Sequence, residues 1–154
     1  MNRPPLYLED LRPGLRFVSG EYRMDRDRMQ AFAAEFDPQP FHLDEQAAGS
    51  SLFHGLVASG WYTAAVAMRL MVTGGLSLAN GIVGLGGEIA WLKPVRPGDV
   101  LHVESEILEI IPSRSKPNQA IVKVRNATLN QAGEEVYVFT AKVLAWKRPK
   151  ENPA

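Results

Sequence analysis

The sequence contains no cysteine, which excludes disulfide bonds, thiolate nucleophiles and thiolate metal sites together. It also has no excess of either charge, because 17 Lys and Arg residues balance 17 Asp and Glu residues, so nucleic-acid binding is not favoured. The most apolar run, residues 56–72, is interrupted by Arg69 and is shorter than the about 20 residues of a membrane span. The N-terminal residues carry two prolines and acidic side chains where a signal peptide would be apolar. We therefore expect a cytoplasmic protein that binds neither nucleic acid nor membrane.

What remains is the composition of an ordinary globular protein, with 45% hydrophobic and 22% charged residues in a chain of 154. A chain of this length and composition can bury the core of one domain. We expect a single domain over residues 1–154, in which residues 1–14 form an extended lead-in and residues 148–154 a polar tail.

Apolar spacing predicts two helices. Residues at i, i+3, i+4 and i+7 form one apolar stripe: Met29, Phe32, Ala33 and Phe36. They predict a helix over residues 25–36 that begins at Asp25 as N-cap and ends before the Asp37–Pro38 pair. A longer helix is expected over residues 58–73, ending at Gly74. Because it is small or apolar nearly all round, we expect the rest of the domain to enclose it.

Alternation and turn residues predict strands on both sides of the long helix. The expected strands are residues 15–24, 81–92, 100–111, 120–129 and 135–146. The last two form a hairpin across residues 130–133. No helix is expected directly after glycines 84, 86 and 87, whereas a dinucleotide-binding loop requires one. We expect these glycines to relieve crowding where the strand passes the substrate or the helix. Periodicity alone therefore predicts an α+β domain.

Titratable residues, prolines and glycines crowd together in residues 36–60, just ahead of the long helix. Asp37 precedes Pro38, which disfavours a helical backbone at Asp37, and Pro40 repeats the constraint before His42. Taken singly, Asp37 is an ordinary residue at a helix end and His42 an ordinary half-buried histidine. Displayed together from a stiffened segment, they are candidates for an acid/base pair.

The same segment resembles a known motif. Residues 36–44, FDPQPFHLD, and residues 56–60, LVASG, resemble the hydratase signature of the MaoC-like dehydratases, which include the (R)-specific enoyl-CoA hydratases. That signature reads G-D-x-N-P-x-H-x-D and then P-I-x-H-G. Departures from it include Phe36 for glycine, Gln39 for asparagine, Leu56 for proline and Ser59 for histidine. The resemblance implies a single hot-dog domain, in which an antiparallel sheet of about five strands wraps a long central helix, and at least a homodimer.

The resemblance also implies an activity, the reversible addition of water to a trans-2-enoyl thioester of coenzyme A. Asp37 and His42 would hold the water between them as acid and base. Gly60 would begin the long helix, and its backbone N–H would serve as an oxyanion hole. Substrate contacts are expected from four further residues: Phe41, Ser59, Trp61 and Gly86. Ser59 is equally a simple N-cap, and Trp61 equally a core residue.

We expect no cofactor beyond the coenzyme A of the substrate. The His42-x-Asp44 spacing is compatible with a metal, but His54 and His102 are isolated and no third ligand is evident. Arg96, in the turn PVRPGD, is expected to be a solvated turn residue. Two other functions remain open on the same scaffold, an acyl-CoA thioesterase and a non-catalytic module that binds acyl thioesters.

Overall fold

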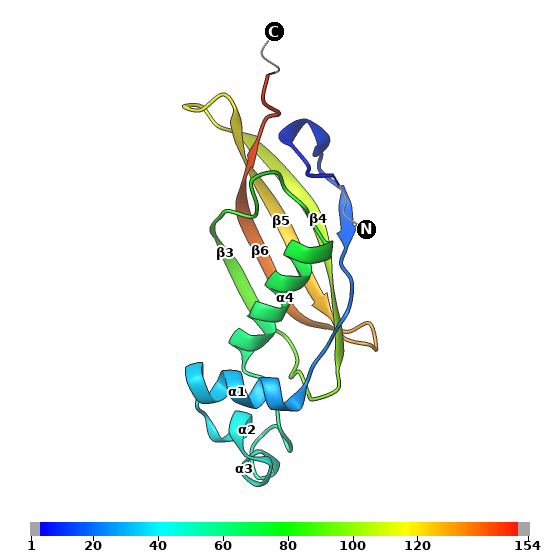
Figure 1. The fold of residues 1–154 in the computed structure, drawn as a ribbon, viewed down its shortest axis with the longest axis vertical. Coiled ribbons are helices and arrows are strands. Elements are labelled where there is room, and N and C mark those ends of the chain that lie inside the picture. The colour runs from blue at the N-terminus through cyan, green and yellow to red at the C-terminus, as the bar shows by residue number, and fades with distance from the viewer. Residues whose placement is uncertain (1–3, 151–154) are drawn as a thin grey trace.

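The computed structural model describes residues 4–150, so the ends of the predicted lead-in and tail, residues 1–3 and 151–154, lie outside the described residues. The chain forms a six-stranded antiparallel sheet in the order β1-β4-β5-β6-β3, with β2 paired to β4 (Figure 1). The strands are β1 Arg16–Val18, β2 Tyr22–Arg23, β3 Gly84–Trp91, β4 Val100–Pro112, β5 Gln119–Leu129 and β6 Glu135–Trp146. A short 3-10 turn, Leu8–Asp10, precedes them.

The three long strands β4, β5 and β6 form the centre of the sheet. Inward residues alternate with outward ones because strand side chains have a period of two. On β4 the buried set is Leu101, Val103, Ser105 and Ile107. The predicted ranges of these three strands agree with the structure to within one residue.

The first predicted strand is wrong as a single element, because residues 15–24 form the two short strands β1 and β2. Between them Ser19 contacts β4 twice, since its N–H donates to the Val103 carbonyl and its hydroxyl accepts the Val103 N–H at 2.8 Å. The Ser19 hydroxyl therefore accepts a hydrogen bond that a backbone carbonyl accepts elsewhere in the sheet. Regular strand pairing with β4 stops at this residue.

The central helix α4, Gly60–Gly74, lies across one face of the sheet (Figure 1). Its buried face is apolar except for Thr63 and packs on the inward side chains of the strands: Tyr62, Val66, Ala67, Leu70 and Met71. Its opposite face is exposed in this chain, with exposed fractions of 56% for Trp61 and 58% for Val72. The prediction that the domain encloses this helix on every side is therefore wrong for the single chain, because the sheet covers only one face.

Three helices gather at one end of the sheet, beside the start of α4 (Figure 1). They are α1 Arg26–Phe36, α2 Pro40–Leu43 and α3 Glu45–Gly49. The predicted helix over residues 25–36 is confirmed, and the Asp25 side chain accepts the Arg28 N–H at 2.9 Å as its N-cap. The segment that begins at Pro40 and carries His42 is a helical turn rather than a loop. Pro40 opens α2, where its fixed φ fits the first turn and its missing N–H is not needed.

Strand β3 is an edge strand, paired only with β6, and all eight of its residues are exposed. Of its glycines, Gly87 lies close to β6, because a methyl group there would overlap the Thr140 carbonyl. Gly86 has open space around it. The expected relief of crowding therefore applies at Gly87, against the neighbouring strand and not against the helix. Among residues 4–150, no helix combines the length and apolarity that crossing a membrane requires.

Candidate active site

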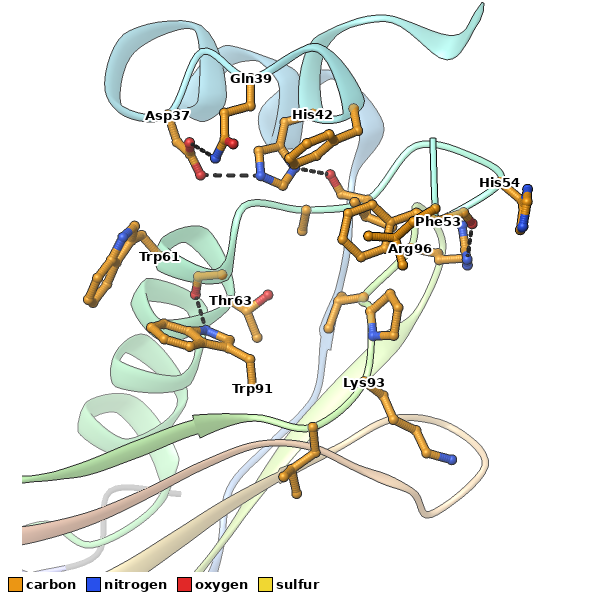
Figure 2. A pocket seen from close by; sticks show the side chains of 18 residues that line it. Asp37, Gln39, His42, Phe53, His54, Trp61, Thr63, Trp91, Lys93 and Arg96 are labelled. Atoms are coloured by element: carbon orange, nitrogen blue, oxygen red, sulfur yellow. Dashed lines mark hydrogen bonds and ion pairs between the residues drawn. The ribbon is translucent and has the colours of Figure 1, made fainter. Parts of the chain in front are cut away.

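Asp37 and His42 meet at the junction of the helical segment and α4 (Figure 2). Asp37 is the C-cap of α1 and His42 lies in α2, and their Oδ2 and Nε2 atoms are 3.2 Å apart. Their side chains are 17% and 7% exposed, respectively. The structure therefore brings together the two residues that the sequence motif singled out.

The His42 ring is oriented by the backbone. Its Nδ1 lies 2.8 Å from the Val57 carbonyl oxygen. A carbonyl only accepts hydrogen bonds, so Nδ1 carries a proton and donates it. The other nitrogen, Nε2, is left to face Asp37, which is the orientation that a proton-transferring histidine needs.

The Asp37 carboxylate accepts two further hydrogen bonds. Gln39 Nε2 donates to Oδ1 at 2.6 Å, and Ser59 Oγ donates to Oδ2 at 2.7 Å. Burial by itself raises the pKa of Asp37, but these two hydrogen bonds and the adjacent His42 outweigh it and lower that pKa below its usual value. The carboxylate is thus held as an anion at neutral pH.

The first turn of α4 adds an unpaired donor. Within residues 4–150, the Gly60 N–H makes no hydrogen bond, as expected at the first position of a helix. The Gly60 carbonyl accepts from Trp91 Nε1 at 2.9 Å, and a Cβ at this position would lie 2.6 Å from that nitrogen. Residue 60 must therefore be glycine for the indole ring to approach it.

A cavity of about 700 Å³ opens beside these groups, and Asp37, His42 and Gly60 all line it. Its walls are largely apolar and include two Phe and two Trp side chains, of which Phe53, Trp61 and Trp91 are labelled in Figure 2. The Phe41 ring meets the His42 ring edge-on at 4.6 Å and the Phe53 ring at 5.2 Å. Trp61 and Trp91 form a second perpendicular pair at 5.1 Å.

Of the four residues predicted to contact the substrate, two line the cavity and two do not. Phe41 and Trp61 line the cavity, and Trp61 is more than half exposed, so the alternative of a core residue is wrong. Ser59 is fully buried, faces Asp37 and is not among the cavity-lining residues. Gly86 lies on β3 and does not line the cavity either.

Several lining residues were not identified from the sequence: Gln39, Phe53, Thr63, Trp91 and Arg96. Arg96 was expected to be solvated, yet it is half-buried and its Nη2 donates to the Phe53 carbonyl at 2.6 Å. Gln39 occupies the asparagine position of the motif, so the motif itself was a signal for it. Trp91 had no such signal, because its contact with Gly60 spans 31 residues of sequence.

The remaining histidines lie apart from the pair. His54 lines the cavity and has a positive φ of 53°, whereas His102 lies on β4 beside Glu104. In the part of the chain that the structure describes, no three His, Asp or Glu side chains form a group that could hold a metal ion. The expectations about metals and cofactors stay predictions.

A sheet wrapped round one long helix, with an Asp–His pair at the N-terminus of that helix, defines a hot-dog protein with an acid/base site. The chain belongs to the MaoC-like domain family, whose model matches residues 14–130. Membership makes it an enzyme of the hydratase and dehydratase class.

Individual relatives agree with this assignment. The crystal structure of a MaoC-like dehydratase from Rhodospirillum rubrum superposes with a TM-score of 0.93 and 58% identity, covering 94% of this chain and 99% of that one. The uncharacterized protein YdeM of Bacillus subtilis (strain 168) is 33% identical over 137 residues, 88% of this chain and 94% of that protein. A 3-hydroxybutyryl-CoA dehydratase of Methylorubrum extorquens is 31% identical over 150 residues, 97% of this chain and 88% of that protein.

Proposed function

We propose that the protein adds water reversibly to the double bond of a trans-2-enoyl-CoA to give the 3-hydroxyacyl-CoA. The observation that carries the proposal is the pairing of Asp37 with His42 at 3.2 Å on the wall of a cavity that Gly60 also lines. The similarity to a 3-hydroxybutyryl-CoA dehydratase supports the same substrate class.

The reaction requires activation of a water, protonation of the α-carbon and stabilisation of negative charge on the thioester oxygen, and the site has a group for each. A water held between Asp37 and His42 loses a proton to the pair as its oxygen bonds to the β-carbon. The pair then returns one proton to the α-carbon, so the net change is the addition of one water. Because the two groups are in direct contact, either can carry the transferred proton, and the pair acts as one acid/base unit.

The third requirement is stabilisation of negative charge on the thioester oxygen. The Gly60 N–H is unpaired and stands at the positive end of the α4 dipole. A preorganised backbone donor of this kind contributes about 3 kcal/mol to transition-state stabilisation in other enzymes. In this mechanism Gly60 binds the developing enolate while Asp37 and His42 transfer protons on the same side of the cavity.

The cavity also suits a coenzyme A thioester. Its apolar walls match an acyl chain, and two cationic side chains line it, Lys93 and Arg96. Lys93 is paired with Glu134, so Arg96 is the lining cation that would meet an anionic group such as the phosphates of coenzyme A. The proposal requires no cofactor besides that coenzyme A.

We further propose that two copies associate along β3. This strand has one free edge, and free edges are commonly covered by another strand or element. Exposed apolar side chains continue from β3 onto α4, including Leu85, Ile89, Met68 and Val72. Light scattering at micromolar concentration should return at least twice the chain mass of 17.0 kDa. A mass equal to one chain would contradict the dimer and leave the hydration proposal intact.

The activity is tested by mixing the purified protein with a panel of trans-2-enoyl-CoA esters of different chain length. Hydration removes the absorbance of the conjugated enoyl thioester without releasing free thiol. Release of free thiol would instead identify a thioesterase. No change in either signal for every ester would leave a binding module.

A further inference from the structure

The Ser59 hydroxyl is fully buried and has a partner on each side. It accepts the Trp61 N–H at 3.3 Å, as the N-cap of α4, and it lies 2.7 Å from Asp37 Oδ2. An N–H only donates, so the oxygen of Ser59 is the acceptor in the first contact. Its single proton is therefore directed to Asp37. Ser59 thus links the first turn of the central helix to the carboxylate.

Capping alone does not explain why this residue is serine. Asp, Asn and Ser serve almost equally well as N-caps, and the chain uses aspartate for this purpose at Asp25 and at Asp44. Next to Asp37, a second carboxylate would place like charges together. An asparagine would have to fit a larger side chain into a site with no exposed surface. Serine is the cap that also donates to a carboxylate within one small volume.

The hydrogen bond from Ser59 to Asp37 matters because it joins the two parts of the proposed active site. Gly60, the next residue along the chain, lines the cavity and has the unpaired N–H, and Asp37 is half of the acid/base pair. Gln39 holds the other carboxylate oxygen. With both oxygens engaged, the carboxylate cannot turn about its last bond without losing hydrogen bonds. The distance between base and oxyanion donor is therefore set by a single hydroxyl.

We propose that Ser59 is a positioning residue, which holds the Asp37 carboxylate at a fixed position relative to the N-terminus of α4. This inference rests on the proposed hydration reaction and assigns no substrate contact to Ser59. It replaces the expectation that Ser59 touches the substrate, since its hydroxyl is shielded from the cavity.

The test uses two substitutions at Ser59 and one matched control in the full chain. Ser59→Gly removes the hydroxyl but destabilises the helix cap less than alanine would, so it is expected to fold. Ser59→Thr keeps the hydroxyl. Asp25→Ala removes an N-cap of the same kind from α1, away from the cavity.

Two readouts separate positioning from stability. In Ser59→Gly, kcat for enoyl-CoA hydration should fall about 10- to 100-fold with KM changed less than about twofold, because a misplacement near 1 Å costs about that much. The ¹³C NMR titration of the Asp37 carboxyl should move to higher pH, since a hydrogen bond to the charged form is lost. Ser59→Thr should restore both values, and Asp25→Ala should change neither.

An Asp37 titration that does not move in Ser59→Gly would overturn the inference, as would a kcat equal to that of Asp25→Ala. The titration needs no substrate, so it distinguishes this failure from that of the proposed function. If the parent protein hydrates no ester but the Asp37 titration still shifts, the link is real and the assigned reaction is wrong.

Discussion

Within residues 4–150, two histidine–carboxylate pairs have the same separation. His42 Nε2 lies 3.2 Å from Asp37 Oδ2, and His102 Nε2 lies 3.2 Å from Glu104 Oε1. The first pair has side chains 7% and 17% exposed, whereas in the second they are 25% and 50% exposed. Distance between the two groups therefore does not separate a candidate active site from a surface contact.

What differs is the surroundings. His42 and Asp37 come from different helices, and each is held by further hydrogen bonds, to Val57 and from Ser59 among others. His102 and Glu104 stand two residues apart on one face of β4 and have only each other among the side-chain hydrogen bonds of residues 4–150. An exposed pair of that kind contributes about 0 to 1 kcal/mol and offers no cavity for a substrate. Orientation by neighbours, rather than proximity, is what the comparison identifies as functional.

The largest expected effect comes from breaking the first pair. Asp37→Asn and His42→Ala should each lower kcat for enoyl-CoA hydration by about 10² to 10⁴, because a positioned acid or base contributes that much. The double variant should lose little more than the worse single one, since groups that act as a unit are not additive. Steady-state kinetics on the four proteins measures this directly.

The matched control is the second pair. His102→Ala and Glu104→Gln should leave kcat and KM unchanged, because His102 is half-buried and Glu104 exposed on β4, and neither lines the cavity. Equal losses from the two pairs would contradict the account, since surroundings would then make no difference.

The next effect concerns the oxyanion donor. Gly60→Ala places a methyl group 2.6 Å from Trp91 Nε1, so either the indole or the first turn of α4 must move. We expect hydration to slow by about 10- to 100-fold, as a displacement near 1 Å does elsewhere. Gly49→Ala is the control, because it stands in α3 with nothing near its Cβ position and should leave the rate unchanged. A Gly60→Ala enzyme as fast as the Gly49→Ala enzyme would remove Gly60 from the mechanism.

A smaller effect is expected from loosening α2, which carries His42. Pro40→Gly enlarges the unfolded ensemble and should cost about 1 kcal/mol of stability at most. We expect kcat to fall by up to about tenfold because the His42 ring is less well fixed relative to Asp37. Thermal melts and kinetics on the same preparation compare the two losses. Unchanged turnover would show that the stiffness of this turn is not used.

The smallest effect is on the pH dependence of stability. Because the folded state lowers the pKa of Asp37 from its usual 3.8, its contribution to folding is present above that value and is lost as pH falls through the folded pKa. The unfolding free energy of the parent should exceed that of Asp37→Asn at about pH 6, and the gap should narrow toward about pH 3. Urea titrations across this range measure the gap. A gap that widened with acid would contradict the lowered pKa.

Much of this architecture follows from local pattern. The stripe on α1, the apolar run of α4 and the alternation of β4 depend on residues close in sequence, and these elements were predicted within a few residues. The Asp37–His42 pair was also predictable, because Pro38 and Pro40 lie between the two residues and restrict the backbone that joins them. Its helical geometry was not, since α2 is a single turn too short for any periodicity.

The features that sequence missed depend on contacts between distant segments. Trp91 reaches Gly60 across 31 residues, and Arg96 reaches the Phe53 carbonyl across 43. The role of Ser59 depends on Asp37, 22 residues earlier, so its capping function was visible while its second hydrogen bond was not. The exposed face of α4 was missed because apolarity predicts burial without saying which molecule provides the cover.

The central claim is that this oriented pair adds water to an enoyl thioester, and isotopic labelling tests it most directly. The parent protein would be incubated with a short trans-2-enoyl-CoA in H₂¹⁸O, and the products analysed by mass spectrometry. The account predicts an intact coenzyme A ester heavier by one labelled water, with the label on the acyl chain, and no such product from Asp37→Asn or His42→Ala. A labelled free acid with released coenzyme A, or labelled ester formed equally well by the two variants, would contradict it.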